Sequence, residues 1–235
     1  YYNDTASLTA TPSSNYQFSG YTVTGGSINN NTFTWADSNA TVKAWFKQTD
    51  PYNPLGLPPY TIRLKFWSNI TPTFPKGTAV QVSSDPNVWD LTYENNDWSE
   101  LYYDGTLRHQ TYIKEVLGAN TTNVTSMVSM FYFCTSLTSV ALFDTSTVIN
   151  MGALFSDCSA LSSVPLFDTS RVTNMASMFN DCKKLKTVPL FNTNKVTNPQ
   201  AMFYGCSSLT TVPLFDTSNW DNMYTTFAGC ISLSS

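Results

Sequence analysis

Apolar and polar positions repeat with a period of 24 residues through the second half of the chain. The string VPLFDTSRVTNMASMF at 164–179 returns, little changed, at 140–155, 188–203 and 212–227. Val164 and Leu166 alternate with their neighbours as residues of a short strand do, so both are expected to face the core. A catalytic site is built once, whereas a repeated string indicates stacked coils that bury their inner faces against one another.

A short helix is expected after the strand of each copy. The spacing i, i+3, i+4 and i+7 of one helical face is shared by Met175, Met178, Phe179 and Cys182. Asn174 is a suitable N-cap, and Pro199 follows the matching Asn198 at the first helical position, where a missing N–H is harmless. Residues that can adopt a left-handed turn fit the other end: Asp157, Asp181, Gly205 and Gly229.

The same copy has the L-x-x-L-x-L spacing of a leucine-rich repeat at Leu161, Val164 and Leu166. The expected fold class is therefore α+β. It is a leucine-rich-repeat solenoid of 24-residue coils, each made of strand, turn and short helix, over residues 116–235. Small β-rich modules are expected to precede it.

The ends of this repeat region are atypical. Val116–Val124 aligns with Val140–Val148 and predicts a degenerate half-repeat that acts as an N-terminal cap. Ser235 leaves the last coil open, so further repeats or another chain are expected to cover it. Because the sequence also opens at Tyr1 without a methionine, we expect a processed or excised piece of a longer protein.

Two residue types recur at the 24-residue period within or next to the expected strand and affect its prediction. Proline occurs inside it at Pro165, Pro189 and Pro213, which predicts a short ladder with one bond missing per coil. A phenylalanine column follows: Phe143, Phe167, Phe191 and Phe215. Strict alternation would expose these rings as a binding surface on the concave face. The alternative is that the chain turns there and tucks the rings inside, which is favoured because burial removes about 25 cal/mol for each Å² of apolar area from water.

All cysteines fall in one register, at Cys134, Cys158, Cys182, Cys206 and Cys230. Zinc sites need close pairs of ligands, which this spacing lacks. Neighbouring coils about 5 Å apart would bring the sulfurs within disulfide range, but stacked side chains point the same way, which is poor bridge geometry. The pattern favours a column of buried free thiols that act as small apolar residues.

The first half reads as β-rich segments. Residues 1–48 predict strands at Ser7–Ala10, Tyr21–Thr24, Thr32–Trp35 and Thr41–Phe46, with a turn at Gly25-Gly26. Residues 49–115 predict a proline-rich linker followed by a small β-rich cap on the first coil. Its expected strands are Tyr60–Trp67 and Gly77–Ser83, and its expected aromatic anchors are Trp89, Trp98 and Tyr102.

The amino-acid composition indicates which classes of partner are expected. Charged residues make up 12% and the net charge is -4, which disfavours nucleic acid, while the wealth of Ser, Thr and Asn with 14% aromatics suits an extracellular or virion-exposed surface. No apolar run approaches the roughly 20 residues of a membrane span, so no membrane insertion is expected. No signal peptide is visible.

No constellation of catalytic residues stands out, so we expect no enzyme, no cofactor and no metal. His109 is alone in a polar stretch and is expected at the surface. Calcium binding is one interpretation of the column Asp144, Asp168, Asn192 and Asp216. We favour the other, because Asp and Asn share the chemistry of a self-capped turn. A glycosidase pair among Asp85, Asp90, Glu94 and Asp97 is the weaker alternative, since nothing selects two of them.

The recurring D-T-S-x-V-T-N-M-x-x-M-F-x-x-C string resembles the BspA-type leucine-rich repeats of bacterial surface proteins over about 116–235. Pro199 and Trp220-Asp221 depart from the pattern. The stretch ending in Ala40–Phe46, with Gly20-Tyr21 and Gly25-Gly26, resembles the internalin-type B-repeat over about 1–48. These resemblances imply a surface-exposed adhesin fragment at the bacterial cell surface, with B-repeats as spacers.

The expected function is thus non-enzymatic binding to a host or bacterial surface protein or a glycan. The alternative is a phage virion fibre or head or tail decoration protein, which would form a homo-oligomer. Candidate binding positions just after the turn differ in every coil: Thr147, Arg171, Lys195 and Asn219. A binding surface varies there, but so does any solvated loop position.

Overall fold

The computed structural model describes residues 5–7, 16–24, 26–29, 32–35, 41–48, 55, 57–67, 72, 77–82, 84–93 and 111–234. The chain forms two compact units, Tyr1–Pro54 and Leu55–Ser235, each considered by itself. The expected surface histidine His109 and the expected anchors Trp98 and Tyr102 lie outside the described residues.

The first unit is built from short antiparallel strands. β1 (Thr5–Ser7), β4 (Thr32–Trp35) and β3 (Gly26–Asn29) form one sheet in that order. β2 (Tyr16–Thr24) pairs with β5 (Thr41–Gln48) in a separate ribbon. The strands predicted within β2, β4 and β5 are present, whereas β3 was not predicted, because the Gly25-Gly26 pair reads as a turn.

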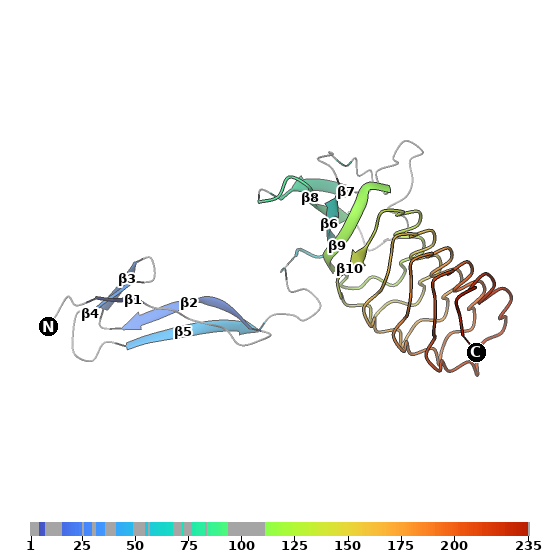
Figure 1. The fold of residues 1–235 in the computed structure, drawn as a ribbon. Helices are drawn as coiled ribbons and strands as arrows, with labels where there is room; N and C mark the ends of the chain where they lie inside the picture. Colours follow the sequence, from blue (N-terminus) through green and yellow to red (C-terminus); the bar gives the residue numbers. More distant parts are fainter. Residues whose placement is uncertain are drawn as a thin grey trace. The chain divides into compact units, whose positions relative to one another are not determined.

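The second unit begins with a five-stranded sheet of order β10-β9-β6-β8-β7 (Figure 1). Its members are β6 (Thr61–Phe66), β7 (Gly77–Gln81), β8 (Val88–Tyr93), β9 (Ile113–Asn120) and β10 (Ser139–Val140). Strand β6 alternates as its sequence predicts, with buried Ile62, Leu64 and Phe66. Trp89 of β8 is also buried, as expected of an anchor.

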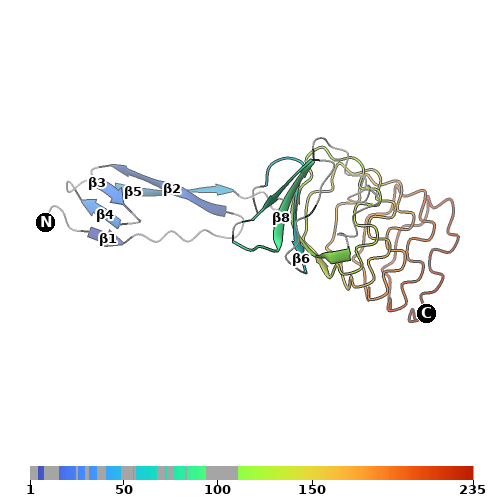
Figure 2. The same cartoon turned by 90° about the horizontal axis from the view of Figure 1, so that it is seen from above.

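Strand β9 belongs both to this sheet and to the first coil. It pairs antiparallel with β6 and parallel with β10, in a register that places Val140 opposite Val116. That register is the 24-residue period, so the degenerate half-repeat predicted at 116–124 is confirmed. The sheet thereby continues directly into the coils of residues 121–234, which lie side by side in both views (Figures 1 and 2).

The expected fold class is wrong in its helices. The described residues are β-rich and contain no α-helix, so a leucine-rich-repeat solenoid with short helices is not what this chain forms. The reason is backbone handedness: each coil has two residues with positive φ where the helix was predicted. One column is Ser129, Ala153, Ser177, Ala201 and Thr225, and the other is Phe133, Asp157, Asp181, Gly205 and Gly229. A left-handed residue such as Ser177 (φ 56°), between Met175 and Met178, ends any right-handed helix.

Alternate backbone amides instead serve two purposes. The N–H groups of Met151 and Ala153 donate to carbonyls of the next coil, at Asn174 (3.0 Å) and Ala176 (2.8 Å). Leu154 lies between Ala153 and Phe155, and its N–H closes a local turn onto the Met151 carbonyl at 3.2 Å. The predicted helical face is nevertheless buried in full at Met175, Met178, Phe179 and Cys182. The spacing therefore identified the inward residues but not their backbone.

Proline explains why the strand of the first coil does not recur. The N–H of Ala141, just after β10, donates to the Val116 carbonyl at 2.9 Å. Pro165, Pro189 and Pro213 occupy the matching position and have no N–H to donate. The predicted short ladder with one missing bond agrees with this: the N–H of Thr210 still donates to the Lys186 carbonyl at 3.1 Å, although no described strand follows β10.

Pro199 removes a hydrogen bond between coils, which the helix prediction did not anticipate. It occupies the position of Met175, whose N–H donates to the Asn198 carbonyl at 3.0 Å. Parallel bridges join Ser126 to Asn150, Asn150 to Asn174 and Asn174 to Asn198, and within residues 111–234 this series stops there. The expectation that the missing N–H is harmless is wrong, because the donor is needed between coils.

Backbone handedness can be tested with two alanines. We expect Ala153→Gly to leave the free energy of unfolding unchanged or to raise it by up to about 1 kcal/mol, because glycine relieves the positive φ. Ala176→Gly, where φ is not positive, should lower it by about 0.5–1 kcal/mol. Urea denaturation measures both. Equal losses at the two sites would favour a helix after all.

Candidate functional site

The outer surface of the coils carries a continuous apolar line, called here the leucine stripe. Its members are Leu142, Leu166, Leu190 and Leu214, which are 38%, 59%, 60% and 96% exposed. The prediction that Leu166 faces the core is therefore wrong. The side chains follow one another at the 24-residue period, so inter-coil stacking places them in one row.

A tight backbone turn produces this reversal. The N–H of Phe167 donates to the Pro165 carbonyl at 3.1 Å, and Phe191 does the same with Pro189 at 2.9 Å. A bond between residues two apart is a γ-turn, with the intervening leucine at its apex. The leucine is therefore pushed outward and the phenylalanine inward.

The phenylalanine column consequently lies inside the stack. Phe143, Phe167 and Phe191 are buried and Phe215 is partly buried, so none of the four forms an exposed aromatic row. Phe191 stacks on Phe179 with centroids 6.1 Å apart and planes at 13°, and Phe179 stacks on Phe203 at 5.6 Å and 6°. Such ring contacts stabilise the core beyond the area they bury.

The variable column is divided between structural and free side chains. The Thr147 hydroxyl donates to the Val124 carbonyl at 2.7 Å, and the Asn219 amide donates to the Asn194 carbonyl at 2.6 Å, both toward the preceding coil. Arg171 and Lys195 are exposed. The column thus offers two adjacent cations rather than a row of free positions.

The Asp and Asn column caps turns, as its chemistry predicts. Oδ1 of Asp168 accepts the Ser170 N–H at 2.9 Å, and Oδ1 of Asn192 accepts the Asn194 N–H at 3.2 Å. Hydrogen bonds from Ser170 lower the pKa of the Asp168 carboxyl. The threonine that follows is buried at Thr145, Thr169 and Thr193, and the Thr169 hydroxyl donates to the Asn192 carbonyl of the next coil at 2.9 Å.

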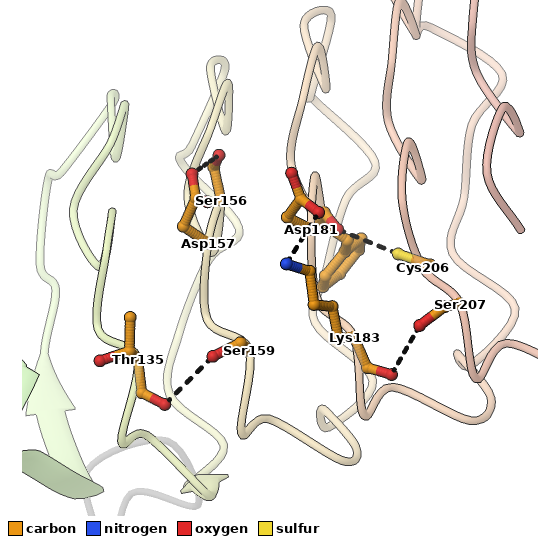
Figure 3. A network of polar contacts seen from close by, with 9 residues as sticks. Thr135, Ser156, Asp157, Ser159, Asp181, Lys183, Cys206 and Ser207 are labelled. Carbon is orange, nitrogen blue, oxygen red and sulfur yellow. Dashed lines mark hydrogen bonds and ion pairs between the residues drawn. The ribbon is translucent and has the colours of Figure 1, made fainter.

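The cysteine column is buried and unbridged, with Cys230 only partly covered. Each described thiol after Cys134 donates to a phenylalanine carbonyl of the preceding coil. Figure 3 shows this contact for Cys206, whose Sγ lies 3.0 Å from the Phe179 oxygen. Hydroxyls make similar links along the same side, with Ser207 donating to the Lys183 carbonyl at 3.4 Å. Burial raises the pKa of Cys182 well above its ordinary value, and that of Cys206 to about 12.

Two of the remaining candidate acids, Asp85 and Asp90, lie within the described residues and are already paired. Asp90 accepts two hydrogen bonds from the Arg63 guanidinium, at 2.6 and 2.7 Å. Asp85 accepts the Asn87 N–H and lies 3.2 Å from the Lys65 ammonium. Glu94 and Asp97 lie outside the described residues. Among the residues that are described, no group of His, Cys, Asp and Glu could hold a metal ion, and no helix could span a membrane.

The thiol column predicts a loss of stability at alkaline pH. A raised pKa in the folded state stabilises the fold below the ordinary thiol pKa of 9.0. That contribution disappears as the pH rises toward the folded pKa, by about 1.4 kcal/mol per pH unit for each thiol. Cys182→Ser keeps a donor but cannot titrate in this range. We expect its unfolding free energy to fall less steeply between pH 9 and 11 than that of the wild type. Equal slopes in urea denaturation would contradict the buried thiol.

The column of Asp and Asn residues that cap turns, called here the turn column, predicts that Asn can replace Asp without a large loss of stability, whereas Ala cannot. Asp168→Ala removes the acceptor for Ser170 and should lower the free energy of unfolding by about 1 kcal/mol. Asp168→Asn should cost little, because Asn192 already fills this role in the next coil. If both variants lost equal stability in urea denaturation at pH 7, the carboxylate charge rather than the turn would be what matters.

Comparison with protein-family models gives two matches. The family described as "Mycoplasma protein of unknown function, DUF285" matches residues 96–211 and 125–235. The divergent InlB B-repeat domain matches residues 1–50, in agreement with the resemblance seen in the sequence. Neither the curated proteins nor the solved structures give a match.

Both matches indicate a surface-associated repeat protein. Neither is a match to a leucine-rich repeat, so that part of the resemblance has no support from the family models. Over residues 96–235, more than half of its length, the chain belongs to the DUF285 family, and a divergent InlB B-repeat domain precedes this part.

Proposed function

We propose that this chain is a non-enzymatic binding protein of a bacterial cell surface, which presents its coils to a macromolecular partner. The observation that carries the proposal is the leucine stripe, because soluble proteins rarely expose aligned apolar side chains without a use for them. The pairing of a B-repeat with DUF285 coils supports the surface location.

The internal chemistry of the coils supports binding rather than catalysis. Their repeated polar side chains are engaged in turns and inter-coil bonds, as in Asp168 and Thr169. A stack held in this way gives a stiff surface, which loses little conformational entropy when a partner binds. The proposed binding partners are a host or bacterial surface protein or a glycan.

The alternative of a phage fibre or decoration protein predicts a different oligomeric state. Fibres and decoration proteins act as symmetric multimers, whereas an adhesin module binds as a single chain. The mass of the purified chain in solution therefore separates the two.

The proposal predicts saturable binding by the purified full chain. We expect immobilised chain to capture intact cells or a defined glycan or matrix protein above an albumin-coated surface, and light scattering to give the mass of a monomer. The bound material should be released chemically unchanged. Capture no better than albumin, or a closed symmetric multimer, would contradict the proposal, and the multimer would favour the virion component.

A further inference from the structure

The surroundings of the leucine stripe restrict what can dock on it. Each stripe residue is followed two positions later by a residue of the turn column, which gives the stripe a rim of Asp144, Asp168, Asn192 and Asp216. Asp168 and Asp216 are exposed, and each uses Oδ1 to cap its turn, at 2.9 and 3.0 Å from the serine nitrogen. Their carboxylates are held in place beside the stripe, with the other oxygen unused by that bond.

On the N-terminal side of each stripe leucine in the sequence, hydroxyl residues recur with one exception. The residues four positions before each leucine are Thr138, Ser162, Lys186 and Thr210. Lys186 stands in the coil whose turn residue is Asn192 instead of Asp. These flanking positions therefore carry three carboxylates, at Asp144, Asp168 and Asp216, and one ammonium, at Lys186, while Arg171 and Lys195 follow further along the same coils.

We propose that the leucine stripe with its aspartate rim is the docking surface for an extended segment of a partner protein that carries aliphatic side chains and lysine or arginine. This rests on the proposed binding function and adds the chemistry of the partner. Aliphatic side chains remove the leucines from water, and the cations pair with the rim carboxylates.

A glycan fits this surface less well than a protein segment does. The stripe is made of leucine side chains, and Leu166, Leu190 and Leu214 each follow a proline, which has no N–H to donate. Sugar hydroxyls placed against the leucine side chains would lose their bonds to water, and only the flanking polar residues could replace these bonds. Of the phenylalanine column, whose rings could stack on a sugar, Phe143, Phe167 and Phe191 are buried and Phe215 is partly buried.

The dimensions suit a short peptide. Coils about 5 Å apart make the stripe roughly 15 Å long, and an extended heptapeptide spans roughly 23 Å. The probe is therefore the synthetic peptide Ac-KLKLKLK-NH2, measured against the full chain by fluorescence anisotropy. Two comparison peptides, Ac-ELELELE-NH2 and Ac-KSKSKSK-NH2, keep the length and change either the charge or the apolar side chains.

We expect the lysine-leucine peptide to bind the wild-type chain and both comparison peptides to bind at least about tenfold more weakly. Leu166→Asn with Leu190→Asn should weaken binding at least about tenfold, since two exposed anchors are lost. Asp168→Asn with Asp216→Asn keeps the turns and should weaken binding and reduce its dependence on salt. The matched control, Ile149→Asn with Tyr204→Asn, removes two exposed apolar side chains outside the stripe and should bind as the wild type does. Equal thermal unfolding midpoints would show that the variants remain folded.

The inference is overturned if the peptide does not bind, if the charge-inverted peptide binds equally well, or if Leu166→Asn with Leu190→Asn binds as the wild type does. A glycan that binds the wild type and is lost with the same leucine variant also overturns it. Capture of cells that survives the leucine variant would leave the binding function standing and place the partner elsewhere. If the wild-type chain captured no cells, the proposed binding function itself would be contradicted.

Discussion

The stack depends on one constraint, the fixed register of its inter-coil hydrogen bonds. In each coil alternate N–H groups, such as those of Met175 and Ser177, donate to carbonyls of the next coil, while the amides between them close local turns. This alternation requires left-handed residues at fixed places. The 24-residue period follows, because one residue more or less would break the register of every donor.

The same constraint decides which side chains face outward. The VPLF string turns tightly at its leucine and buries its phenylalanine, and the VALF string of the first coil also exposes Leu142 and buries Phe143. The exposed leucines, the buried rings and the aspartate rim are thus consequences of a single local turn repeated by the stack. A surface built in this way can change its rim residues, as Asn192 shows, without altering the backbone.

Much of this could be read from the sequence, and the reasons for the failures are specific. The period, the pairing of Val140 with Val116 and the buried face at Met178 and Cys182 follow from spacing. The helix does not, because the spacing of buried residues does not report the sign of φ, and Ala153 or Ser177 is not a residue typical of a left-handed turn. The stripe was missed because strict alternation was applied through the VPLF and VALF strings, where the leucine is exposed and the phenylalanine is buried.

The most direct test of this account is hydroxyl-radical footprinting of the native chain, read residue by residue by mass spectrometry. It compares neighbouring side chains within one peptide, without any substitution. The account predicts that Leu166 and Leu190 are oxidised well above Phe167 and Phe191, after correction for intrinsic reactivity. Protected leucines beside oxidised phenylalanines would contradict the reversal, and with it the stripe and the binding surface built on it.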